Sequence, residues 1–172
     1  MDILAKLERL VNIGKGTREL QQQINVLEVS NIWISIESRY RVLEETKIFL
    51  NNAKDADLKI IIELGINRLE RQVKMLEDIM AKYAIPSSKR PPAVLNEAAK
   101  SQVITDEYIF RRIFSGIRAF LSIHLESFAE TPSLSLREMF KDFLIEEADI
   151  YDRMFEYGKI KGWVDHPPDF RL

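Results

Sequence analysis

The segment AIPSSKRPPAVLNEAAKSQVI, residues 84–104, divides a chain of 172 residues into two halves. Its prolines Pro86, Pro91 and Pro92 restrict their own backbone and that of the residues before them, which predicts an extended connector. At about 3.3 Å per residue, this connector reaches up to roughly 70 Å. A helix of about 27 residues is only about 40 Å long at ~1.5 Å per residue, so the connector can cross a whole helical bundle.

Two helices are predicted before the connector, because apolar residues recur there at intervals of three, four and seven. The first extends from about Arg18 to Asn52. Asp55 or Asp57 can cap the second, which ends at the connector. Their stripes are Val29, Trp33, Ile36, Tyr40, Leu43 and Leu50 in the first helix and Leu58, Ile62, Gly65, Leu69, Leu76, Ile79 and Tyr83 in the second. We interpret Gly65 as a place where another helix comes close.

Two more helices are predicted after the connector. Thr105 is a cap for the third helix, and the acidic residues after it suit the first turn. Ser133 or Ser135 opens the fourth helix, which ends between Gly158 and Gly162. The stripes are Phe110, Phe114, Ile117, Leu121, His124 and Phe128 in the third helix and Leu136, Phe140, Phe143, Glu147, Ile150, Met154 and Tyr157 in the fourth.

The lengths of the connections predict the topology. Short links make antiparallel hairpins of helices one and two and of helices three and four. The long connector makes the second and third helices parallel, which is the connectivity of a ferritin-like four-helix bundle. We therefore predict one all-α domain over residues 1–172, with a short helix (Ile3 to Val11) and a turn in 1–16, the bundle in 17–163 and a tail in 164–172.

Composition excludes several classes of function. The chain has 25 Lys and Arg against 27 Asp and Glu, a net charge of −2, so no nucleic-acid partner is expected. The absence of Cys excludes disulfides and thiolate chemistry, and two His are too few for a multi-histidine metal site. Since no run of about 18 apolar residues occurs, we expect no membrane partner and synthesis in the cytoplasm.

Ferritin-like bundles commonly hold two metal ions through Glu-x-x-His motifs. That motif is absent, since Leu121 stands three residues before His124. A carboxylate-rich centre has only weak candidates, which are Glu37, Glu44, Glu63, Glu70, His124 and Glu147. At about 1.5 Å per residue the acids fall on two levels of the bundle, so we predict no metal and no cofactor.

Two polar residues, Glu147 and His124, lie on stripes that should face the core. A buried unpaired charge costs several kcal/mol, so Glu147 needs a partner. Arg118 on the third helix lies at nearly the same level, and we predict a structural polar core of Glu147, Arg118 and His124. No catalytic constellation is recognisable, so we expect the protein not to be an enzyme; the competing hypothesis makes Glu147 a metal ligand.

Two regions carry a resemblance to a known family: LEETKIFL at 43–50, which leads into the second helix, and the region that runs from SLREMF at 135–140 to YGKIKGW at 157–163. Together they resemble a ferritin-like family of endospore-forming bacteria labelled "putative spore coat proteins" and related to the spore coat protein F family, over about Val26 to Leu172. The resemblance implies a structural or interaction protein deposited in the spore coat, with other coat proteins as partners. The alternative is a divergent ferritin-like protein that binds a metal or a small ligand.

Apolar residues at both ends of the chain predict self-association. Leu7, Leu10 and Val11 lie on the short first helix, and Trp163 and Phe170 leave the bundle in a tail. Apolar groups outside a core favour an interface, so we expect a homodimer.

Overall fold

The computed structural model describes residues 3–87, 90, 104–165 and 170. Its regular structure consists of α-helices, and no strand occurs within those ranges. The helices are α1 (Ile3–Val11), α2 (Thr17–Gln21), α3 (Val26–Asn52), α4 (Ala56–Tyr83), α5 (Asp106–Glu130) and α6 (Leu134–Lys161). The predicted all-α class is confirmed. None of the helices described is long and apolar enough to span a membrane.

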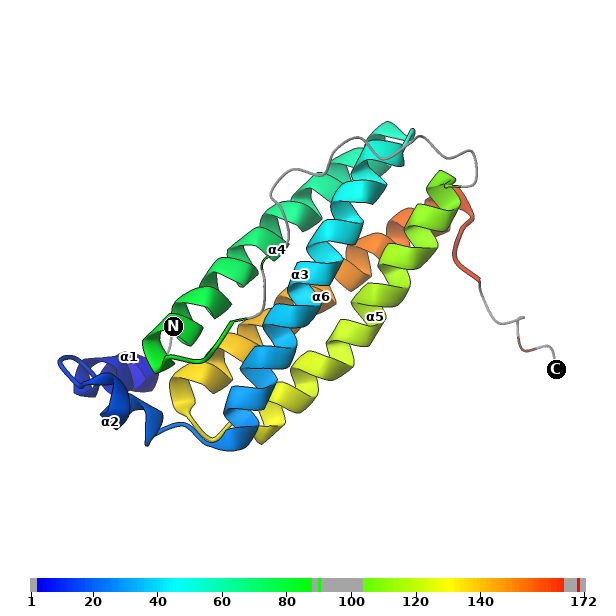
Figure 1. Ribbon diagram of the computed structural model, residues 1–172. Helices are drawn as coiled ribbons and strands as arrows, with labels where there is room; N and C mark the ends of the chain where they lie inside the picture. The colour runs from blue at the N-terminus through cyan, green and yellow to red at the C-terminus, as the bar shows by residue number, and fades with distance from the viewer. Residues whose placement is uncertain (1–2, 88–89, 91–103, 166–169, 171–172) are drawn as a thin grey trace.

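Helices α3 to α6 pack side by side, with α3 and α4 as one hairpin and α5 and α6 as the other (Figure 1). The starts of α4 and α5 meet, because the backbone N–H groups of Lys54 and Asp55 donate to the Asp106 carboxylate at 2.7 and 3.1 Å. Both helices run from there toward the other end, so they are parallel (Figure 1). Most of the connector, and with it its predicted course, lies outside the described residues.

The predicted single helix from Arg18 to Asn52 is wrong, because the chain breaks between α2 and α3. Asn25 and Glu28 form a capping box in which each side chain accepts from the other residue's backbone N–H, at 2.9 and 3.0 Å. This arrangement starts a new helix by satisfying two free donors. The buried Glu28 carboxylate also accepts from the Ser133 N–H at 2.8 Å and so joins the starts of α3 and α6.

Helix α3 buries a face slightly rotated from the predicted one. Ile32 and Ile36 are fully buried, whereas Trp33, placed on the stripe, is 41% exposed. The buried positions continue through Arg39 and Leu43, at intervals of three and four residues that keep one face of the helix toward the bundle. The rotation therefore brings an arginine into the core.

The end of α6 folds back onto the core. Gly162 has a positive φ of 71° that ends the helix, and the Trp163 N–H donates to the Gly158 carbonyl at 2.8 Å. The Trp163 ring packs against Phe110 and Tyr157, at 5.7 and 5.8 Å between ring centroids. The prediction that Trp163 leaves the bundle is therefore wrong, because the glycine turn directs it inward.

Gly158 on α6 lies directly against Phe110 of α5, so we expect Gly158→Ala to destabilise the fold by about 1–3 kcal/mol through overpacking. A Cβ there would lie 2.2 Å from Cζ of Phe110 and 2.6 Å from Cγ2 of Val164. Urea denaturation measures the effect. Gly116→Ala is the matched control, because its Cβ meets nothing within 4 Å and alanine is the better helix former. Equal stability of the two variants would contradict the close packing.

Candidate functional site

One buried polar side chain from each long helix comes together in the middle of the bundle. We call this set the polar layer: Arg39 from α3, Gln72 from α4, His124 from α5 and Glu147 from α6. Arg39 Nη2 donates to Oε2 of Glu147 at 3.2 Å and is hydrogen-bonded to Nε2 of His124. Gln72 donates to the carboxylate of Glu146, the neighbour of Glu147, at 2.9 Å.

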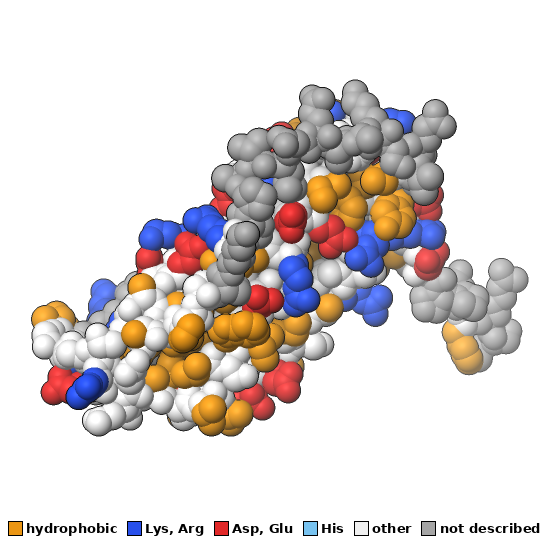
Figure 2. Space-filling model, viewed as in Figure 1, with side chains coloured by type: hydrophobic (Ala, Val, Ile, Leu, Met, Phe, Trp, Pro, Cys, Tyr) orange, Lys and Arg blue, Asp and Glu red, His pale blue; other side chains and the backbone are white. Residues whose placement is uncertain are grey.

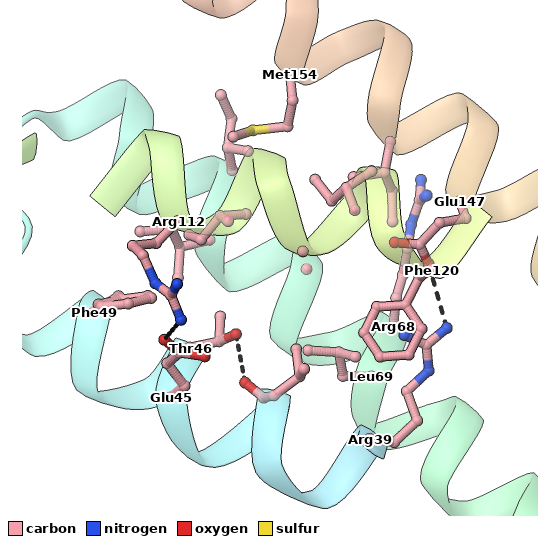
Figure 3. A pocket seen from close by; sticks show the side chains of 18 of the residues that line it. Arg39, Glu45, Thr46, Phe49, Arg68, Leu69, Arg112, Phe120, Glu147 and Met154 are labelled. Atoms are coloured by element: carbon pink, nitrogen blue, oxygen red, sulfur yellow. Dashed lines mark hydrogen bonds and ion pairs between the residues drawn. The ribbon is translucent and has the colours of Figure 1, made fainter. Parts of the chain in front are cut away.

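The Arg39 guanidinium occupies the centre of the polar layer and is 1% exposed. Its central carbon lies 4.0 Å from the ring centroid of Phe120, so one face of the cation rests on an aromatic ring. Figure 3 shows Arg39 directed at Glu147, with Phe120 alongside. The ion pair and the stacked ring together compensate for removing this charge from water.

Burial and the charge of Arg39 set the protonation of the layer. Burial raises the pKa of Glu147, while the Arg39 charge and hydrogen bond oppose the rise. Burial, helped by the Arg39 charge, lowers the pKa of His124 to about 3, so this imidazole is neutral. Because Nε2 accepts from Arg39, we assign the proton to Nδ1, which is buried with no hydrogen-bond partner in the described structure.

The predicted pairing of Glu147 with Arg118 is wrong. Arg118 is exposed on α5, and the partner of Glu147 is Arg39 on α3. A side chain at the right level can still lie on the outer face of its helix, which is the case for Arg118. Spacing could have identified Arg39, since it follows Ile36 by three residues and precedes Leu43 by four.

The metal-ligand candidates do not converge. Glu37 and Glu44 are half-buried, Glu63 and Glu70 are exposed, and Glu70 forms an ion pair with Lys47 at 2.9 Å. Only His124 and Glu147 come together, with Nε2 and Oε2 3.8 Å apart, and Arg39 bonds to both atoms. Within the described residues no three His, Asp or Glu side chains group as metal ligands would.

A cavity of about 90 Å³ lies beside the polar layer, between the four long helices (Figure 3). Arg39, Phe120 and Glu147 line it, together with apolar side chains of all four helices. Gly65 on α4 also lines it, and a Cβ at Gly65 would meet nothing within 4 Å. Our interpretation of Gly65 as a close helix contact is therefore wrong; the missing side chain leaves open space.

The surface has apolar side chains at the end where α1 and α2 lie (Figure 2). Exposed large apolar residues from α1 to the first turn of α3 are Ile3, Leu7, Leu10, Val11, Ile13, Val26 and Leu27. We call these seven residues the N-terminal apolar surface. Phe170 is 90% exposed, whereas Trp163 belongs to the core packing.

Comparison with known proteins identifies a family and a fold. The structure is similar to the crystal structure of a protein from Bacillus halodurans C-125 named "putative spore coat protein", with a TM-score of 0.81 and 19% sequence identity. The similarity covers 88% of this chain and 99% of that one and, at this identity, shows a shared fold. No curated protein matches the sequence. A family model matches residues 13–171, and the chain therefore belongs to the DUF3231 family of proteins of unknown function.

Proposed function

We propose that this protein is a non-enzymatic structural or interaction protein of the spore coat, built on a ferritin-like four-helix bundle. The observation that carries the proposal is the polar layer, in which Arg39 binds the central acid, Glu147. A guanidinium there supplies the positive charge that metal ions supply in the active bundles of this class. We infer that Glu147 has a structural role, in which its ion pair with Arg39 links α6 to α3.

The ferritin-like assignment is supported by the helix order. The two antiparallel hairpins are joined through α4 and α5, which are consecutive in the chain and run parallel. Parallel consecutive helices need one long crossover between them. Up-down-up-down bundles have short links throughout and place these two helices antiparallel.

The chemistry of the layer supports a role without catalysis. His124 is the residue type that most often acts as a general base, but its Nε2 is hydrogen-bonded to Arg39. Its burial, together with the positive charge of Arg39 beside it, holds its pKa near 3, far below the neutral range in which such bases work. Glu147 is likewise engaged by Arg39.

The spore coat location is supported by the segments that resemble the coat-related family and by the name of the Bacillus halodurans protein that shares the fold. We expect a tagged copy of this chain, produced during sporulation in its own host, to be extracted with the coat layers of purified spores. Fractionation and immunoblotting measure this, with a cytoplasmic enzyme of the same cells as the control. Recovery only in the spore core or the mother-cell lysate would contradict the location.

We also propose that the chain forms a homodimer through the N-terminal apolar surface. Leu7 is 51% exposed and Leu10 is 61% exposed, so a partner that covers them removes apolar area from water. We expect light scattering to give twice the 20.1 kDa chain mass, and Leu7→Lys/Leu10→Lys to give the monomer mass. Lys6→Ala on the same helix is the control and should stay dimeric. A wild-type monomer at high micromolar concentration would contradict the proposal.

A further inference from the structure

We propose that the cavity between the four long helices is a binding site for a small, uncharged, apolar molecule no larger than one aromatic ring. The proposal is independent of the spore coat role and rests on the space, the lining and the charges of the cavity. Each of these is set by residues of the described helices.

The space is kept open by two glycines on opposite sides of the bundle. Gly65 on α4 and Gly116 on α5 both line the cavity, and a Cβ at either would meet nothing within 4 Å. Alanine favours a helix more than glycine does and would fit at both positions. Because protein interiors hold few voids larger than a water molecule, a void of about 90 Å³ bordered by two such glycines points to an occupant.

The lining selects an apolar occupant. Apolar side chains from each helix form most of the wall, among them Phe49, Leu69, Ile113 and Met154. Thr46 also lines the cavity, but its hydroxyl already donates to the Val42 carbonyl at 2.6 Å. Water is held poorly against this apolar part of the wall, because a buried water needs two to four polar partners.

Two of the three arginines that line the cavity already form ion pairs, which disfavours an ionic occupant. At one end Arg39 binds Glu147 at 3.2 Å, and at the exposed rim Arg112 binds Glu45 at 2.9 Å (Figure 3). Arg68 donates to the Glu146 backbone carbonyl at 3.2 Å. Both carboxylates of the lining are held by these arginines, and any ion would lose its hydration against a mostly apolar wall.

The volume limits the size of the occupant. An engineered cavity of roughly 150 Å³ in another protein accommodates benzene, and the cavity here is smaller, about 90 Å³. One ring, partly at the rim beside Arg112, or a short branched hydrocarbon is therefore the upper limit.

Benzene is the probe, and benzoate, with the same ring and one added charge, is its matched control. We expect benzene to raise the thermal unfolding midpoint, because a ligand that binds only the native state stabilises it. Benzoate at the same concentration should leave the midpoint unchanged. Nuclear magnetic resonance of the methionine methyl groups locates the ring: Met154 lines the cavity and should shift, whereas the buried Met80, which does not line it, should not.

Two variants test whether the glycines create the site. Gly65→Ala/Gly116→Ala places two methyl groups in the cavity and should weaken the apparent Kd for benzene about tenfold or more, which corresponds to at least ~1.4 kcal/mol. Gly65→Leu fills more of the space and should abolish the response. Gly16→Ala is the control, since Gly16 lies outside the bundle, before α2, and has no neighbour within 4 Å of its Cβ. The double alanine variant decides the test if the leucine variant does not fold.

Three results would overturn the proposal. The first is a wild-type midpoint that does not move in buffer saturated with benzene. The second is a benzoate shift as large as that of benzene, which would show that the site does not discriminate against charge. The third is a full benzene response in the double alanine variant, which would place binding elsewhere.

Discussion

Replacing Arg39 by methionine is expected to lower the free energy of unfolding by about 3–5 kcal/mol at pH 7, because it leaves the Glu147 carboxylate buried without its partner. Glu147→Leu should lower the free energy of unfolding by a similar amount, since it leaves the Arg39 guanidinium buried without its carboxylate partner. The variant Arg39→Met/Glu147→Leu should recover much of the loss, because an apolar pair of similar volume replaces the ion pair. Urea denaturation of the four proteins measures the coupling.

The control for this cycle is the exposed ion pair between Arg71 and Glu146, whose nitrogen and oxygen are 2.6 Å apart. Its Arg71 side chain is 54% exposed, and Arg71→Met should therefore cost less than about 1 kcal/mol. Additive losses for Arg39→Met and Glu147→Leu would contradict the pairing.

The same variant has a distinctive pH dependence. Without Arg39, one proton shared between His124 and Glu147, 3.8 Å apart, neutralises the layer. Between pH 7 and pH 5 the folded Arg39→Met protein should therefore bind a proton at His124 or Glu147, whereas the folded wild type binds none at His124. The stability difference between wild type and Arg39→Met is expected to shrink as the pH falls from 7 to 5.

Acid is expected to destabilise the wild type through His124, by about 3 kcal/mol between pH 7 and pH 4. The unfolded chain binds a proton at this histidine below pH ~6.5, whereas the fold keeps it neutral down to about pH 3. Between about pH 3 and pH 6.5 the unfolded state binds more protons than the folded state, so the free energy of unfolding rises with pH. Above about pH 6.5 the stabilisation that comes from neutral His124 is complete.

His124→Gln separates this effect from that of the carboxylates. Glutamine keeps an acceptor for Arg39 but does not titrate, so the stability lost on acidification should be smaller by about 3 kcal/mol than in wild type. Denaturant unfolding at several pH values gives both curves. Parallel curves for the two proteins would contradict a neutral buried histidine.

The helices could be predicted from the sequence where local chemistry fixes them. Asp55 and Thr105 cap α4 and α5, each accepting a backbone N–H of the first turn, as the sequence indicated. The capping box of Asn25 and Glu28 has an equally local signature, but extending the helix back to Arg18 from a stripe that begins at Val29 passes over it. The break could therefore have been found from the cap residues.

The site was harder to predict, because its partners are distant in the chain. Arg39 meets His124 and Glu147 across 85 and 108 residues. Reading apolar residues as inward and charged ones as outward places Glu147 in the core only through its spacing and leaves Arg39 on the surface. The cavity exists in part because Gly65 has no side chain. A glycine in a helical stripe gives the same sequence pattern whether it borders a neighbouring helix or empty space, so the cavity could not be predicted.

The ion pair between Arg39 of α3 and Glu147 of α6 joins the two hairpins and also determines how they align. A slip of one hairpin by one helical turn, about 5.4 Å, would keep apolar stripes in contact but would separate Arg39 from Glu147. Each wrong alignment would then bury two lone charges, so the layer discriminates between alignments that apolar contact alone tolerates. In the variant Arg39→Met/Glu147→Leu, which lacks this ion pair, several alignments of the hairpins should coexist. Nuclear magnetic resonance should then give multiple resonances for the Met154 methyl group. Wild type should give one.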